Sequence, residues 1–262
     1  MDNTTTNLRD NPMPTRRKQR KSQREDTGLN LKQWEVTAKT PGQKSYLKTI
    51  HRNEVTFAIG PPGTGKTFIA ASEAILGLAK GNYEKIIVTR PLVTIENERT
   101  GFLPGTLEKK TMPFLRPIYD EMKNYLTEDD FRRLLNRETI EVCTLGNMRG
   151  RTFKNSFIIL DEAQNASYGQ LKSALTRIGF GSTMVITGDP DQTDLNDGVA
   201  GSMLRLAETL QDVRGVGVSH LTKDDIVRSE LVQRIVDRIE DLENGVQRIC
   251  EPSYAHYEEE SW

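Results

Sequence analysis

The chain has 262 residues, of which 35% are hydrophobic and 28% charged, and its formal net charge is −1. This length and apolar content suit one sizeable folded domain with polar additions at its ends. The near-neutral charge excludes nucleic-acid binding through bulk positive charge, so any site for a polyanion must be local.

Membrane and disulfide-stabilised classes are also disfavoured. The longest apolar runs are far too short to span a bilayer, and the N-terminal region has no apolar segment of the kind found in signal peptides. The two cysteines, Cys143 and Cys250, lack metal-ligand spacing and fit a reducing compartment. The sequence therefore predicts a cytoplasmic protein.

Both ends of the chain are polar. Residues 1–35 contain the basic run Arg16–Arg24 and predict a disordered tail, either a solubilising segment or an arm that holds nucleic-acid phosphates. Residues 249–262 are acidic with aromatic side chains, which predicts a solvated tail, with partner docking as the alternative. The folded domain is expected over residues 36–248.

Between the tails, strand-like runs alternate with helical ones. This alternation predicts an α/β fold with a mainly parallel sheet and helices on both faces. Strands are expected near 54–59, 85–89, 139–143, 156–160, 183–187 and 213–218. Helices are expected near 41–51, 66–79, 113–136 with a break at Thr127, 168–178, 199–210 and 224–243.

A phosphate-binding loop follows the first strand and precedes the second helix. The octapeptide fits G-x-x-x-x-G-K-[ST] and consists of Gly60, Pro61, Pro62, Gly63, Thr64, Gly65, Lys66 and Thr67. Its backbone N–H groups and the helix N-terminus attract phosphate oxygens; Lys66 reaches the β/γ-phosphates, and the Thr67 hydroxyl ligates Mg²⁺. A chance glycine-rich turn would not also carry this strand and helix, so we expect a nucleoside triphosphate to bind here.

Two further strands end in polar residues on the ligand side of the sheet. Asp161 and Glu162 follow residues 157–160, which predicts a metal-holding carboxylate and a general base for water. After residues 183–187, Gln192 is placed to contact the γ-phosphate or the attacking water. A solvated acidic turn and an ordinary Gly-Asp-Pro turn are the respective alternatives.

Two arginines are candidates for stabilising charge on the transferred phosphate. Arg90 lies just past the strand at 85–89 and begins an irregular stretch to residue 117 that contains several prolines and glycines. Arg228 begins the last predicted helix, where a surface salt bridge is the competing interpretation.

The motifs in this order resemble the PhoH family of P-loop ATPases over roughly residues 38–245. The resemblance rests on the phosphate loop and on Thr40–Gln43, Val88–Pro91, Gly101–Gly105, Met148–Phe153, Ile159–Asn165, Thr176–Gly179, Gly188–Asp189 with Gln192, and Asp225–Arg228. It implies a RecA-like domain similar to the first domain of superfamily 1 helicases, with the additional-strand type of sheet.

The resemblance also implies roles for individual residues. Gln43 matches a glutamine that reads adenine, and Gln192 matches a motif that couples the γ-phosphate to nucleic acid. Arg228 matches an arginine suited to a finger role, although Ser229 stands where the family usually has histidine. The nucleotide-binding set would then be Gln43, residues 60–67 and Arg90, with Thr67 and Asp161 as metal ligands.

What the resemblance implies about function is an Mg²⁺-dependent ATPase linked to single-stranded nucleic acid, with RNA favoured over DNA. The alternative is a nucleotide-controlled binding or assembly module that hydrolyses ATP slowly or not at all. Because the chain has length for one RecA-like domain, we expect a ring, most simply a hexamer, with Arg228 completing a neighbouring site. The similarity extends to compact bacteriophage versions and to an association with phosphate starvation, and it predicts no nuclease.

Overall fold

The computed structural model describes residues 28–29, 31–91, 116–193 and 201–243. The basic run Arg16–Arg24, Cys250, the acidic tail and most of the irregular stretch after Arg90 lie outside these residues. The chain forms two compact units, Met1–Ile226 and Val227–Trp262.

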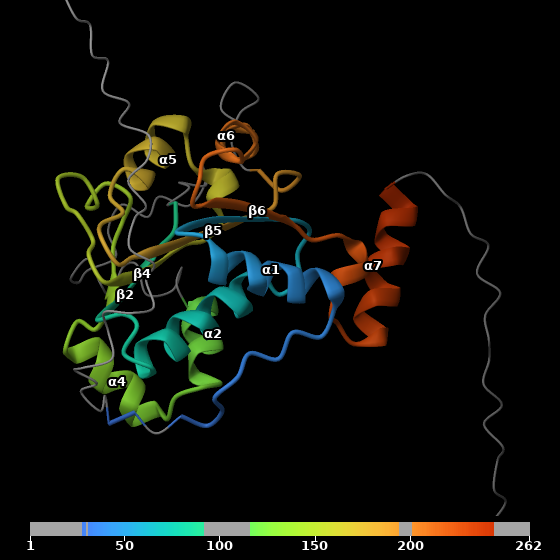
Figure 1. The fold of residues 1–262 in the computed structure, drawn as a ribbon. Coiled ribbons are helices and arrows are strands. Elements are labelled where there is room, and N and C mark those ends of the chain that lie inside the picture. Colours follow the sequence, from blue (N-terminus) through green and yellow to red (C-terminus); the bar gives the residue numbers. More distant parts are fainter. Residues whose placement is uncertain (1–27, 30, 92–115, 194–200, 244–262) are drawn as a thin grey trace, which may run out of the picture. The chain divides into compact units, whose positions relative to one another are not determined.

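In the described part of the first unit, six strands form one parallel sheet in the order β3-β2-β4-β5-β1-β6 (Figure 1). The strands are β1 (Val55–Ile59), β2 (Lys85–Thr89), β3 (Ile140–Val142), β4 (Ser156–Leu160), β5 (Thr183–Gly188) and β6 (Val216–His220). Because β5 lies between β1 and β4, the phosphate-loop strand and the acidic strand are not neighbours, which is the additional-strand arrangement that the family resemblance implied.

Helices cover both faces of the sheet (Figure 1). The strand side chains alternate between the faces, with Phe57 in one hydrophobic cluster and Ala58 in the other. One face carries α1 (Pro41–Arg52), α2 (Lys66–Ala79), helical residues 116–123 and α4 (Glu128–Asn136). The other carries α5 (Tyr168–Leu175) and α6 (Ser202–Leu210), so the predicted α/β fold is confirmed.

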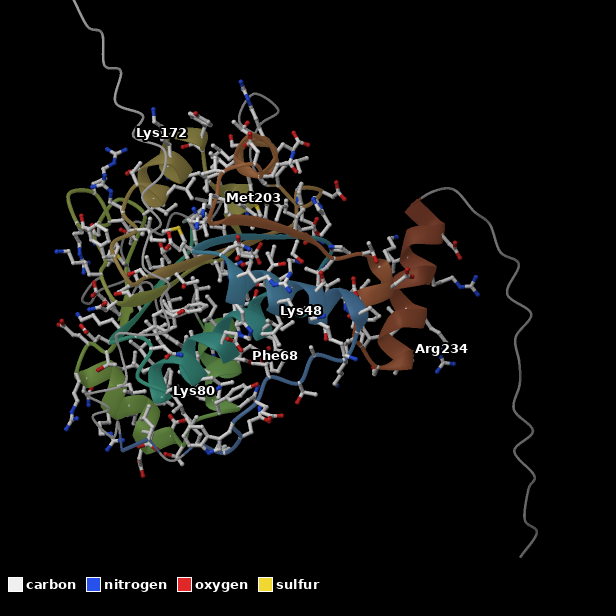
Figure 2. The ribbon with its side chains drawn as sticks, viewed as in Figure 1. Lys48, Phe68, Lys80, Lys172, Met203 and Arg234 are labelled. Atoms are coloured by element: carbon white, nitrogen blue, oxygen red, sulfur yellow. The ribbon has the colours of Figure 1, made fainter. Side chains whose placement is uncertain are left out.

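Side-chain caps set where several helices begin. Thr40 accepts a hydrogen bond from the backbone N–H of Gln43 at the start of α1, and Thr127 accepts one from Asp130 at the start of α4. The predicted helix break at Thr127 is confirmed by that cap. On the other face, Lys172 of α5 extends away from the sheet (Figure 2). Met203 of α6 is buried, with 1% of its surface exposed.

Three predicted boundaries need correction. The last strand begins at Val216, because the preceding turn holds Gly215 at φ 92°. The last helix does not start at 224: a 3-10 turn, η2 (Lys223–Asp225), closes on the Thr222–Asp225 capping box, and α7 (Glu230–Glu243) begins later. Both predictions extended a regular element into the turn residues that precede it.

The third correction concerns the N-terminal boundary. Leu29 and Leu31, within the predicted disordered tail, are buried in the hydrophobic core. The backbone N–H of Lys32 also donates to the Tyr125 carbonyl over 2.9 Å. Two apolar residues in a polar stretch give little periodic signal, although tertiary packing can bury them. Across the described residues, no helix combines the length and apolarity needed to cross a bilayer.

Candidate nucleotide site

Four loops meet at the carboxyl ends of the central strands. The phosphate loop follows β1, Arg90 follows β2, Asp161 follows β4 and Asp189 follows β5. Neighbouring strand ends are joined by backbone hydrogen bonds: Gly60 donates to the Gly188 carbonyl over 3.3 Å, and Asp161 donates to the Thr89 carbonyl over 3.0 Å. Parallel topology therefore brings together the motifs after β1, β4 and β5 at one edge.

The phosphate loop needs its glycines. Gly60, Gly63 and Gly65 have φ values of 156°, 81° and 81°, which side chains disfavour. A Cβ at Gly60 would also collide with the carbonyl oxygen of Leu221, which follows β6. Only glycine lets this loop pass so close to the neighbouring strand and still turn into α2.

Lys66 is folded over the loop that precedes it. Its Nζ donates to the carbonyl oxygens of Gly60 over 2.6 Å and Pro61 over 2.8 Å. Burial lowers the pKa of the Lys66 ammonium below its ordinary value, against the opposing effect of three carboxylates. Those carboxylates belong to Asp189, Asp161 and Glu162. The ammonium thus lies inside the loop, at the strand ends that carry these acids.

Asp161 is 5% exposed and is held by two hydroxyl groups. Its Oδ1 accepts hydrogen bonds from Thr67 Oγ1 over 2.9 Å and from Thr187 Oγ1 over 2.5 Å. Carboxylate and hydroxyl oxygens are suitable ligands for Mg²⁺, which proteins bind through one or two side chains together with substrate phosphates. Within the described ranges, no cluster of three or more His, Cys, Asp or Glu side chains could hold a metal alone. The Thr67 hydroxyl and the Asp161 carboxylate suit a cation whose other ligands are phosphate oxygens.

Glu162 has an unusual backbone and two side-chain partners. Its φ of 53° lies in the left-handed region, which is uncommon for a residue with a side chain. Its Oε1 pairs with Arg90 Nη2 at 3.2 Å, and its Oε2 accepts a hydrogen bond from Gln164 Nε2 over 2.6 Å. The predicted nucleotide contact of Arg90 stays a prediction, since its guanidinium contacts Glu162 here.

The loop after β5 joins the same network through its backbone. Gln164 Nε2 also donates to the Gln192 carbonyl over 3.1 Å, and Gln164 Oε1 accepts from the Asp189 N–H over 3.1 Å. The Gln192 residue is exposed at this edge of the sheet. Its backbone is thereby connected to Glu162, while the predicted role of its side chain stays a prediction.

Gln43 lies against the phosphate loop and is 4% exposed. Its Nε2 donates to the Thr64 carbonyl over 3.1 Å, and its Oε1 accepts from the Lys39 N–H over 2.7 Å. An amide oxygen has a second lone pair and its nitrogen a second hydrogen, so capacity for a base edge remains. The structure thus places Gln43 beside the loop, and adenine reading stays a prediction.

A buried carboxylate fixes the segment that carries Gln43. Asp225, 5% exposed, accepts hydrogen bonds from Thr40 Oγ1 over 2.5 Å, Gly42 N over 3.0 Å and Thr222 N over 3.0 Å. Burial alone would raise the pKa of the Asp225 carboxyl, but these hydrogen bonds outweigh burial and hold it below the usual range. The start of α1 is thereby fastened to η2.

Arg228 belongs to the second unit, in the irregular segment before α7. The sequence predicted that Arg228 begins the last helix, but α7 starts two residues later, at Glu230. Its finger role stays a prediction.

Sequence reasoning gave no individual role to three residues of this edge: Gln164, Thr187 and Asp225. Each lies inside or directly beside a recognised motif, which was the available signal. Apart from Glu162 and Thr222, their partners lie in segments distant in the sequence, and a linear motif does not show such contacts.

The family described as PhoH-like protein matches residues 35–240. The chain belongs to this family. A PhoH-like protein of Synechocystis sp. is 48% identical over 83% of this chain, and one of Bacillus subtilis is 44% identical over 81%. The match spans 66% of the length of each relative.

Among solved structures, a large terminase from a thermophilic bacteriophage matches with a TM-score of 0.50 at 13% identity. The match covers 76% of this chain and 50% of the terminase. At that identity the similarity concerns the fold alone. Family membership, the phosphate loop and the sheet order together make this PhoH-like chain a P-loop protein of the ATPase type.

Proposed function

We propose that this chain is an Mg²⁺-dependent ATPase whose cycle is linked to single-stranded nucleic acid, RNA in preference to DNA. The observation that carries the proposal is the hydrogen bond from Thr67 Oγ1 to Asp161 Oδ1, which is 2.9 Å long and lies beside the phosphate loop. One residue comes from α2 and the other from the end of β4, and both present oxygen to the same point. A Mg²⁺–nucleotide complex needs this juxtaposition.

Each residue of the site would have a separate role in hydrolysis. Bound Mg²⁺ would neutralise charge on the phosphates and fix their orientation. Lys66 would exchange its two carbonyl partners for phosphate oxygens, and the loop N–H groups would add further donors. Glu162, next to Asp161, would accept a proton from the attacking water once one carboxylate oxygen is released from its present partner.

The link to nucleic acid is supported by two features. The Gly188–Gln192 loop is exposed at Gln192 and is hydrogen-bonded through Gln164 to Glu162. A nucleic-acid strand that contacts this loop would therefore influence Glu162, the proposed general base. The basic run Arg16–Arg24 offers local positive charge in a chain of net charge −1. A single ATPase unit would contact a nucleic-acid strand from one side only. We therefore propose a ring of subunits, a hexamer, that surrounds the nucleic acid.

A second candidate function is supported by the engagement of Glu162. Both of its oxygens are occupied, by Arg90 and by Gln164, and Lys66 is bound to its own loop. A protein that stays in this state would bind nucleotide and hydrolyse it slowly, acting as a nucleotide-controlled assembly module. The two candidates differ in turnover and not in nucleotide binding.

The deciding experiment is steady-state ATP hydrolysis with and without single-stranded RNA, paired with direct nucleotide binding. For the enzyme, we expect Glu162→Gln to bind MgATP like wild type and to lose turnover by on the order of 10²-fold or more. Lys66→Ala should abolish hydrolysis, and Lys48→Ala, the same change at an exposed position of α1, should not.

Three outcomes are informative. Tight MgATP binding with negligible wild-type turnover, with or without RNA, would favour the assembly module. Wild-type hydrolysis by Lys66→Ala would overturn the site itself. Equal losses of binding and turnover in Glu162→Gln would make that residue structural.

A further inference from the structure

Gln164 lies two residues after Glu162, within the short 3-10 turn η1 (Ala163–Asn165), and is 4% exposed. Its amide makes three hydrogen bonds. Nε2 donates to Glu162 Oε2 over 2.6 Å and to the Gln192 carbonyl over 3.1 Å, and Oε1 accepts from the Asp189 N–H over 3.1 Å. Both N–H groups and the oxygen are therefore used, one bond toward the base and two toward the loop after β5.

The loop fixes which way the amide faces. A backbone N–H can only donate and a carbonyl can only accept, so Asp189 requires the Gln164 oxygen and Gln192 requires its nitrogen. The remaining N–H then points to Glu162. Orientation is thus passed from the loop to Gln164 and from Gln164 to the carboxylate.

Close packing keeps these groups together. A Cβ at Gly188 would lie 2.7 Å from Gln164 Oε1 and 2.5 Å from Met203 Sδ, so the glycine permits the loop to approach. A buried amide that loses its partners is strongly unfavourable, because no water replaces them. A displacement of the loop should therefore move Gln164, and with it Glu162.

We propose that Gln164 is the positioning residue of Glu162, which takes its orientation from the loop at residues 188–193 and sets the orientation of the carboxylate. The proposal rests on the proposed function for its kinetic consequence, although the physical coupling does not require hydrolysis. A phosphate group that displaces this loop would reorient the base without touching it.

The kinetic test compares Gln164→Leu with Gln170→Leu. Gln170 lies on α5, where its side chain accepts from the Ser167 N–H in an exposed capping box, so the control makes the same change outside the network. We expect Gln164→Leu to lower kcat by on the order of 10-fold with KM for ATP unchanged, because its side chain acts on the base. Gln170→Leu should keep the wild-type kcat. An unchanged kcat in Gln164→Leu, or equal changes in KM and kcat for both variants, would overturn the proposal.

A thermal-stability cycle tests the coupling without hydrolysis. Gln164→Glu keeps an acceptor for Asp189 but places an oxygen against the Glu162 carboxylate, so the melting temperature should fall. Adding Glu162→Gln to that variant restores a donor–acceptor pair, with the polarity reversed, and should recover part of the loss. Additive shifts in the double variant would overturn the proposal.

The two tests also separate the proposals. If no variant hydrolyses ATP but the melting temperatures are coupled, the proposed function fails and the positioning contact stands. If hydrolysis is normal and the melting temperatures are additive, the ATPase assignment stands and the role of Gln164 fails.

Discussion

Replacing Thr187 by valine removes one buried hydroxyl from the site and leaves the side-chain volume nearly unchanged. Thr187 is 0% exposed on β5, and its Oγ1 donates to Asp161 Oδ1 over 2.5 Å. A hydrogen bond to a charged group contributes about 1.5–3 kcal/mol, and the added methyl returns up to about 1 kcal/mol through burial. The expected net loss is about 1–2 kcal/mol in the free energy of unfolding.

Thr56 offers a matched control on the neighbouring strand. It is also 0% exposed, and its hydroxyl has no hydrogen-bond partner among the residues that the structure describes. In Thr56→Val the same atoms change, but an unpaired polar group is removed from the core, so stability should stay the same or rise. The two variants should therefore differ in sign.

Urea unfolding without nucleotide measures both free energies. For a unit of this size, about 1–2 kcal/mol corresponds to a fall of roughly 2–8 °C in the melting temperature. A second measurement is the Mg²⁺ concentration for half-maximal ATP hydrolysis. It should rise in Thr187→Val, because a donor that orients the Asp161 carboxylate is gone. Thr187→Ser, which keeps the hydroxyl, should retain the wild-type Mg²⁺ dependence.

The result that would refute this reasoning is equal stability of Thr187→Val and Thr56→Val. The Asp161 carboxylate would then gain nothing from the hydroxyl. An unchanged Mg²⁺ dependence with lowered stability would limit Thr187 to folding.

Two further predictions concern Asp225 and Arg228. Because the pKa of Asp225 is lowered from its ordinary 3.8 in the folded state, its contribution to stability is present above that pH and is lost as the pH falls through the lower folded-state pKa. In thermal melts from about pH 6 downwards, Asp225→Asn should be less stable than wild type near neutrality and should lose less on acidification; parallel curves would contradict this. If Arg228 completes a neighbouring subunit's site, mixing inactive Arg228→Ala with inactive Lys66→Ala should restore some ATPase activity. No recovery in assemblies shown to contain both variants would place Arg228 in its own subunit's site or outside any site.

Local patterns were enough to predict the sheet and most of its helices. The strand at residues 55–59 is apolar throughout, as a strand covered on both faces must be, and the glycine-rich octapeptide after it has one strong structural interpretation. The same reasoning placed Asp161 and Glu162 at the end of β4, because parallel strands present their carboxyl ends at one edge.

The predicted element boundaries were wrong where the local sequence signals were weak. The Thr222–Asp225 capping box replaced the first turn of the expected last helix, and Leu29 and Leu31 were buried although their surroundings are polar. The burial of the two leucines depends on partners distant in sequence, and so do the hydrogen bonds that Asp225 accepts from Thr40 and Gly42. Periodicity within a short window does not contain that information.

The hydrogen bonds of the site belong to the same category. The motifs named Asp161, Glu162 and Gln192, but the contacts from Thr187 to Asp161 and from Gln164 to Gln192 required the β4–β5 pairing and its register. A chemical group can be identified from its neighbours along the chain. The direction in which it points is set by neighbours across the sheet, because buried polar groups take whichever partner the packing brings within reach.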